Sequence, residues 1–316
     1  MKLGFEKWHG CRNDFIVCWV SHNDAKYLLP SLQRQATELC SRDGAGVGAD
    51  GILVLQYQDK AQFWPDTLSI INSDGSLARN CGNGLRCAFS SMYQGHLEER
   101  PGDDRPESLS LKVEGREFTG QFLQGASAGQ NPLVAVDMGV PELNQEHSWH
   151  DKAEKVMKDL SSEPCFEYLK NAEWFSCDLG NPHLVIFHKN PERQLMLSLG
   201  KALQNTPEWD GINVHLAGQV TWQGQDQQAA EKSLGSRVGD LYEVFVWERG
   251  VGETNACGSG ACAVAASVLS EGFSDRDEWL GVRMPGGPVY VRQTEAGESI
   301  VLAGPAEMVF RGSLDI

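Results

Sequence analysis

Short runs in which apolar and polar residues alternate recur along the whole chain, and most are bounded by Gly, Asp or Asn. Alternation with a period of two is typical of β-strands, because successive side chains point to opposite faces of a sheet. The pattern predicts strands at residues 2–8, 14–20, 51–57, 67–72, 108–113, 132–138, 183–188, 241–247, 287–293 and 306–312.

Helical periodicity is rarer. It predicts helices at residues 31–42, directly after Pro30, at 85–97 and at 261–272. Strands outnumber helices and do not alternate with them regularly. This favours an α+β fold with antiparallel sheets over a doubly wound parallel sheet. A segment at 142–175 is rich in Glu, Lys and Trp and is interpreted as an irregular surface insertion.

One arrangement occurs twice: a cysteine, a glycine-rich turn and then a helical pattern. It reads NCGNGLRCA at 80–88 and NACGSGACA at 255–263. In each half of the chain, strands and a polar loop precede the motif and one helix follows it, which indicates an internal duplication. The sequence therefore predicts two similar domains, with residues 125–131 as the linker.

A cysteine at a helix N-terminus can act as an acid or a base. The unpaired N–H groups there stabilise the thiolate, and they also bind a carboxylate or a developing oxyanion. Two such elements that act on one carbon could remove its proton from one side and return a proton from the other. Two other interpretations stay open: the cysteine as a small residue in a tight structural corner, and a redox-sensing thiol.

Composition narrows the classes of partner. The formal net charge is −16, which argues against a nucleic-acid partner, and no apolar run is long enough to span a bilayer. The N-terminus lacks the apolar core of a secretory signal, so we expect a cytoplasmic protein.

The chain contains nine cysteines at irregular spacing, which favours reduced thiols over disulfides. They include no C-x-x-C pair, which argues against a structural zinc site. Cys87 and Cys262 are expected to pack inside.

The chain resembles the diaminopimelate epimerase family, whose members are cofactor-independent enzymes of lysine and peptidoglycan precursor synthesis. The blocks that carry the resemblance run in family order over nearly the whole chain. They are KWHGCRNDFIV (7–17), GVGADG (46–51), NSDGSLARNCGNGLRC (72–87), GNPHLV (180–185), GINV (211–214), WERGVGETNACGSGACA (247–263) and GPAEMVFRG (304–312).

The resemblance implies two pseudo-symmetric domains, each a β-barrel-like sheet around a central helix, with the active site in the cleft between them. Residues 1–130 with 305–316 would form the domain that carries Cys81, and residues 131–304 the domain that carries Cys257. The resemblance also implies a homodimer, no metal and no cofactor, and LL-2,6-diaminopimelate converted to its meso isomer as the reaction.

Site residues follow from the same resemblance. Cys81 and Cys257 are implied to be the base and the acid, and they exchange roles with reaction direction. His183 and Glu248 are implied to tune the ionisation of these thiols. The residues implied to bind the substrate are Gly82, Asn83, Gly258 and Ser259 at the reacting carboxylate, and Asn13, Asn72, Asn181, Asn213, Arg249 and the Glu248 backbone at the far end.

Three positions depart from the family pattern: Arg12 replaces a usual Gly, Gly51 replaces a frequent Gln, and Ser259 replaces a usual Thr. None of them changes the two thiols or Arg249. The sequence leaves two alternatives to diaminopimelate epimerisation: a racemase of another amino acid, such as histidine, on the same scaffold, and a non-enzymatic redox or binding protein.

Overall fold

A computed structural model of the chain describes residues 2–44, 46–58, 64–100, 104–123, 132–144, 148–170 and 172–316. The chain divides into two compact units: unit 1, Met1–Asp137 with Ala303–Ile316, and unit 2, Met138–Leu302. The predicted linker at 125–131, and with it the predicted boundary after residue 130, lies outside the described residues. The C-terminal segment belongs to the same unit as the N-terminus, because its strand pairs with the first strand of the chain.

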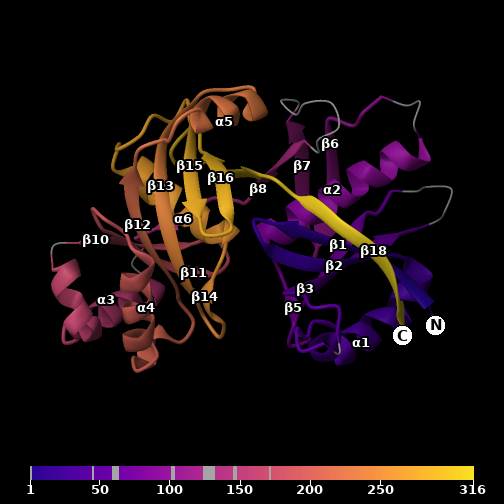
Figure 1. Ribbon diagram of the computed structural model, residues 1–316, viewed down its shortest axis with the longest axis horizontal. Coiled ribbons are helices and arrows are strands. Elements are labelled where there is room, and N and C mark those ends of the chain that lie inside the picture. The colour runs from indigo at the N-terminus through magenta and orange to yellow at the C-terminus, as the bar shows by residue number, and fades with distance from the viewer. Residues whose placement is uncertain are drawn as a thin grey trace. The chain divides into compact units, whose positions relative to one another are not determined.

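Unit 1 contains a mixed sheet. Its strands are β1 (Lys2–Gly10), β2 (Asn13–Ser21), β3 (Gly51–Tyr57), β4 (Thr67–Asn72), β5 (Leu77–Ala78), β6 (Ser108–Val113), β7 (Arg116–Leu123), β8 (Leu133–Asp137) and β18 (Glu307–Asp315). The strands pair in the order β18-β1-β2-β3-β4-β6-β7-β8, and only β2–β3 and β4–β6 are parallel among these pairs. Figure 1 shows β18, in yellow, beside β1.

Unit 2 repeats this topology. Its strands are β9 (Glu142–Leu143), β10 (Glu173–Asp178), β11 (Pro182–Phe187), β12 (Asn213–Val220), β13 (Val238–Glu248), β14 (Gly252–Thr254), β15 (Trp279–Met284) and β16 (Gly287–Arg292), and β17 (Val301–Gly304) follows across the boundary between the units. The order β10-β11-β12-β13-β15-β16 alternates antiparallel and parallel pairs as β1-β2-β3-β4-β6-β7 does. The shared order supports the duplication that the two thiol motifs indicate, and the predicted α+β fold is confirmed. The sheets are not purely antiparallel as expected, because each contains two parallel strand pairs.

A helix is buried at the centre of each unit. In unit 1 this is α2 (Gly82–Glu99), which contacts strands from both ends of its sheet, β18 and β8. In unit 2 it is α6 (Gly258–Ser270), which contacts β10 and β16. Both helices are buried along most of their length: α6 consists almost entirely of small and apolar residues, whereas α2 also buries polar side chains, among them Asn83 and Arg86. Cys87 and Cys262 are fully buried in them, as predicted. No helix among the described residues is long and apolar enough to cross a membrane.

A second helix packs against the sheet of unit 1. In unit 1, α1 (His22–Leu39) packs Leu28 and Leu32 against Ile16 of β2. The prediction that this helix begins after Pro30 is wrong. It begins at His22, because Oγ of Ser21 accepts a hydrogen bond from the backbone N–H of Asp24 and caps the first turn. Pro30 sits exposed in the middle of the helix.

The interpretation of 142–175 as an irregular surface insertion is also wrong. The segment contains β9, α3 (Ser148–Leu160), a 3₁₀ helix (Pro164–Leu169) and the start of β10. Val156 and Leu160 of α3 are buried against Leu199 of α4 (Arg193–Leu203), so the segment forms part of the apolar core of unit 2. Its charged residues occupy the exposed side of an amphipathic helix. Unit 2 also contains α5 (Asp226–Leu234) and a short 3₁₀ turn (Pro207–Trp209).

Candidate active site

The first predicted catalytic thiol, Cys81, occupies the N-cap position of α2. Its backbone is extended, and its Sγ accepts a hydrogen bond from the backbone N–H of Gly84 at 3.4 Å. The side chain is half-buried. The first N–H groups of a helix have no partner within the helix, so this position stabilises negative charge on the sulfur or on a carboxylate that approaches it.

The second predicted thiol, Cys257, occupies the same position at the start of α6 and is buried. Its sulfur makes no capping bond to the helix. Instead, Sγ lies 3.7 Å from Oγ of Ser259, and the Cys257 backbone N–H donates to Sδ of Met284 at 3.3 Å. The hydroxyl of Ser259 is therefore placed to donate to this sulfur. The two thiols begin equivalent helices but differ in what holds them.

A directed chain of hydrogen bonds orients two of the predicted substrate-binding amides in unit 1. Nη2 of the fully buried Arg86 donates to Oδ1 of Asn83 at 2.8 Å. Nδ2 of Asn83 donates to Oδ1 of Asn13 at 3.1 Å, and Nδ2 of Asn13 donates to Oδ2 of Asp50 at 2.7 Å. A guanidinium only donates and a carboxylate only accepts, so the two ends of the chain fix the orientation of both amides.

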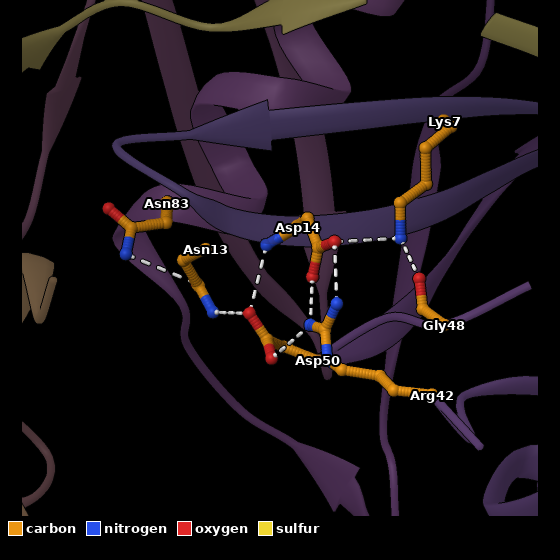
Figure 2. A network of polar contacts seen from close by, with 7 residues as sticks. All are labelled: Lys7, Asn13, Asp14, Arg42, Gly48, Asp50 and Asn83. Atoms are coloured by element: carbon orange, nitrogen blue, oxygen red, sulfur yellow. Dashed lines mark hydrogen bonds and ion pairs between the residues drawn. The ribbon is translucent and has the colours of Figure 1, made fainter. Parts of the chain in front are cut away.

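Figure 2 shows how the acceptor end of this chain is held. Arg42 donates to Asp14 at 3.1 Å and to Asp50 at 2.8 Å, and Lys7 forms an ion pair with Asp14 at 2.9 Å and donates to the carbonyl of Gly48. Burial alone raises the pKa of Asp14, but the hydrogen bonds from Arg42 and Lys7 outweigh it and hold that pKa below its usual value. Both carboxylates are thus fixed acceptors that pre-orient Asn13.

Asn72, also predicted to bind substrate, lies in a turn of its own. Its Nδ2 donates to Oγ of Ser76 at 2.9 Å, and its backbone N–H donates to the Ser76 carbonyl at 2.8 Å. The side chain is exposed. Asn72 pairs with Gly51 across β3 and β4, where a Cβ on Gly51 would lie 2.7 Å from the Ile71 carbonyl oxygen. The close approach of the two strands therefore explains the glycine at this position.

In unit 2, a second series of hydrogen bonds leads to Cys257. Two imidazoles form its start: His183 of β11 and His215 of β12 lie 2.8 Å apart, Nδ1 to Nε2. Nε2 of His183 lies 3.1 Å from Oδ1 of Asn181, and Nδ2 of Asn181 donates to Oγ of Ser259 at 3.4 Å. The structure thus joins four predicted site residues with His215, which the sequence analysis did not select.

Both imidazoles are neutral at ordinary pH. Burial lowers the pKa of His215 to about 3. Burial, and next the neighbouring His215, lowers the pKa of His183 well below its usual value. Neither ring can then supply a positive charge to the Cys257 thiol. His183 is connected to Asn181 and His215 through hydrogen bonds that it makes as a neutral ring.

Arg249 and Asn213 meet at the turn that follows β13. The backbone N–H of Arg249 donates to Oδ1 of Asn213 at 3.1 Å. The Arg249 guanidinium is exposed and forms no ion pair with any residue in the described part of the chain. Next to it, the Glu248 carboxylate accepts a hydrogen bond from the hydroxyl of Thr254. A free guanidinium on a tight turn is well placed to bind an external carboxylate.

Three residues that hold the site were missed from the sequence. Asp50 and Arg86 lie inside the blocks GVGADG and NCGNGLRC, so their place in these blocks was a usable signal. His215 directly follows the block GINV, and only the pairing of β11 with β12 brings it to His183. A cavity of about 800 Å³ in unit 2 is lined by residues of the 3₁₀ helix and α4, and no predicted site residue is among the described residues that line it.

Comparison with known proteins relates almost the whole chain to one family. The family model described as "Diaminopimelate epimerase" matches residues 5–143 and 175–309. The unmatched stretch between them contains α3 and the 3₁₀ helix. A diaminopimelate epimerase of Nostoc punctiforme is 32% identical over 316 residues, which cover 99% of this chain and 100% of the relative. One of Bacillus subtilis is 30% identical, covering 98% of this chain and 97% of the relative.

Solved structures of lower identity share the fold. A predicted epimerase from Pseudomonas aeruginosa superposes with a TM-score of 0.65 at 16% identity, and the match covers 99% of each chain. A phenazine biosynthesis protein of the PhzF family from Bacillus anthracis gives a TM-score of 0.63 at 15% identity over all of both chains. A hydroxyproline epimerase from Agrobacterium vitis gives 0.58 at 11% identity, covering 99% of this chain and 91% of that one.

Proposed function

Because the chain belongs to the diaminopimelate epimerase family, a family of isomerases, we propose that it converts LL-2,6-diaminopimelate to meso-diaminopimelate in lysine and peptidoglycan precursor synthesis. One structural observation supports the assignment of the reaction to particular residues. Two units of the same topology each begin their central helix with Cys-Gly-x-Gly, and the cysteine occupies the N-cap in both. A duplicated thiol fits a reaction that must treat the two faces of one carbon alike.

The two cysteines act as a base and an acid. In one direction the thiolate of Cys81 or Cys257 takes the proton from the α-carbon, and the thiol of the other donates a proton to the opposite face. The carbon thereby inverts, and the two sulfurs exchange protonation states. The reverse reaction exchanges their roles. Oxidation states do not change, and no cofactor takes part in this proposed step, because backbone donors stabilise the carbanion in place of an electron sink.

The charge that develops on the substrate is stabilised at the two helix starts. Removal of the α-proton moves negative charge onto the adjoining carboxylate. The backbone N–H groups at Gly82, Asn83, Gly258 and Ser259 lie in the first turns of α2 and α6, a position where helix geometry provides no preceding carbonyl of the helix as acceptor. Fixed donors of this kind stabilise a developing anion without reorganising during the reaction.

The far end of the substrate carries a second ammonium and carboxylate, which must be recognised so that only one centre inverts. We assign this to Asn13, Asn72, Asn181 and Asn213, with Arg249 and the Glu248 backbone. The exposed guanidinium of Arg249 supports its role as the carboxylate ligand. The chain of hydrogen bonds from Arg86 to Asp50 supports a pre-oriented Asn13. His183 and Glu248 are assigned to tune the thiols.

The proposal includes the remaining properties that the family implies. The domain of residues 1–130 with 305–316 carries Cys81, and the domain of residues 131–304 carries Cys257. The enzyme is a cytoplasmic homodimer. Light scattering coupled to size-exclusion chromatography tests the dimer directly, and a monomer mass in the active protein contradicts it.

Hydrogen exchange at the substrate tests the function. The purified, reduced protein is incubated with LL-diaminopimelate in D₂O without added cofactor, and the α-protons are followed by NMR. We expect deuterium to enter one centre as the meso isomer appears, and no exchange with Cys257→Ala. The absence of exchange with correctly folded wild-type protein contradicts the proposal. Exchange in L-histidine under the same conditions instead identifies a racemase of another amino acid.

A further inference from the structure

Two histidines and one cysteine of unit 2 lie close enough to share one ion. His183, His215 and Cys257 each offer one ligand atom, and the three atoms lie within 4.8 Å of one another. All three side chains are buried. They come from β11, β12 and the start of α6, so three different elements hold them. Their spacing in the sequence, which contains no C-x-x-C or H-x₃-H pattern here, gives no sign of this cluster.

Hydrogen bonds fix where the protons of the two neutral rings lie. Because Oδ1 of Asn181 can only accept, His183 donates to it from Nε2 and carries its lone pair on Nδ1. His215 therefore donates from Nε2 to that lone pair. The remaining lone pair, on Nδ1 of His215, is buried and has no hydrogen-bond partner among the described residues. The lone pair on Nδ1 of His183 is engaged by His215, so this hydrogen bond must break before both rings can bind one ion, which they do in the neutral form.

Two imidazoles and a thiolate are a ligand set that suits Zn²⁺. In tetrahedral zinc sites the Zn–N distance is about 2.0–2.1 Å and the Zn–S distance about 2.3 Å, which places neighbouring ligand atoms roughly 3.3–3.6 Å apart. For an ion to bind, the ring nitrogens of His183 and His215 must move apart from 2.8 Å, and the ligand atoms that lie up to 4.8 Å apart must move closer together. Both changes are shifts of about 1 Å. Three protein ligands leave the fourth position to water.

We propose that His183, His215 and Cys257 form a Zn²⁺ site whose occupation inhibits the enzyme. On binding, the thiol of Cys257 releases its proton to solvent and its sulfur donates an electron pair to the ion, while each imidazole keeps one N–H. Oxidation states do not change. A sulfur bound to Zn²⁺ neither accepts nor delivers a proton, so inversion stops. The inhibition rests on the proposed function, whereas the metal site does not.

Metal binding is measured first, independently of activity. Zn²⁺ is titrated into the full-length reduced protein under argon by calorimetry, and Co²⁺ is added separately as a spectroscopic probe. We expect one ion per chain and the absorption of tetrahedral Co²⁺ with a thiolate charge-transfer band. Cys257→Ser and His215→Asn should each weaken Zn²⁺ binding at least about tenfold, since even changes around the ligands cost that much. His215→Gln is a second variant if His215→Asn fails to fold by circular dichroism.

Two matched controls remove a thiol or an imidazole outside the cluster. Cys81→Ser and His188→Asn should bind Zn²⁺ with wild-type affinity. Wild-type affinity in Cys257→Ser or in a folded His215 variant overturns the proposal, as does an equal loss of affinity in either control. In the exchange assay, Zn²⁺ should inhibit and a chelator should restore activity. If the protein binds Zn²⁺ specifically but shows no substrate hydrogen exchange in metal-free buffer, the metal site stands and only the proposed function is contradicted. If it shows exchange but does not bind Zn²⁺, the proposed function stands and the metal site is contradicted.

Discussion

Gly260 of α6 lies directly against the imidazole of His215, so close that a Cβ on Gly260 would stand 2.1 Å from Cε1 of that ring. The equivalent position in the other thiol motif is Gly84 of α2. There a Cβ would lie 3.2 Å from Cδ2 of Leu53 and 3.4 Å from Sγ of Cys81. The same motif position is therefore closed by a rigid ring in one unit and by a flexible side chain in the other.

Alanine at these two glycines should have unequal effects. Gly260→Ala forces the His215 ring to move in a packed interior, and we expect it to lower the free energy of unfolding by about 1–3 kcal/mol. Gly84→Ala requires a shift of only a few tenths of an ångström, offset by about 0.5–1 kcal/mol of gained helix preference. Urea unfolding of both variants measures the difference. Equal changes in the two proteins contradict this account of the packing.

Arg12 carries backbone strain at the turn between β1 and β2. Its φ is 64° and that of Cys11 is 54°, so both residues of this two-residue loop are left-handed, a conformation that favours glycine. Arg12→Gly should raise the free energy of unfolding by about 0.5–1 kcal/mol, because it removes the clash of Cβ with the backbone. Arg12→Ala is the matched control: it shortens the side chain, keeps Cβ and should give no such gain.

The two thiols that we assign to catalysis should respond differently to replacement by serine. Both Cys81→Ala and Cys257→Ala are expected to abolish epimerisation, and so are the serine variants, whose hydroxyls do not ionise near neutral pH. The effect of serine on the free energy of unfolding should differ between the two positions. At position 81, serine should be more stable than alanine by about 1 kcal/mol, because it keeps the capping bond to the Gly84 N–H. At position 257 no capping bond exists, so serine should show no such advantage. Thermal or urea unfolding of the four variants checks this, and near-normal turnover in any of them contradicts the assigned roles.

The buried imidazoles make stability depend on pH below neutrality. The pKa values of His183 and His215 are lower in the folded than in the unfolded protein, so below about pH 6.5 the unfolded chain binds protons that the folded chain does not. Stability should therefore fall on acidification by about 1.4 kcal/mol per pH unit for each ring. His215→Gln should reduce the slope between pH 6 and pH 5 by about that amount. Unfolding curves at several pH values test it, with His188→Gln as a control; identical slopes in wild type and His215→Gln contradict it.

The alternation of apolar and polar residues predicted ten of the strands, because a side chain alternates faces of a sheet wherever that sheet lies in the fold. Strands β7, β10, β12 and β15 were not predicted from it. The central helices were predicted at 85–97 and 261–272 from helical periodicity, but the burial of the polar residues Asn83 and Arg86 in α2 could not be read from that pattern. The two thiols stood out because the motif is local and occurs twice. The Ser21 cap and the buried face of α3 were also local patterns, but Pro30 and the charged residues of 142–175 concealed them.

Only the tertiary structure decided which distant residues support the site. His183 and His215 lie on different strands and meet because β11 and β12 pair in parallel. Arg86 orients Asn83 and also donates from Nε to the carbonyl of Pro305, at the far end of the chain, at 3.5 Å. Such contacts depend on strand register and on the return of β18 to β1, which are set by the packing of the whole unit. A local pattern specifies the conformation of its own segment, whereas the partner of a buried polar group is fixed only when the segments around it have packed.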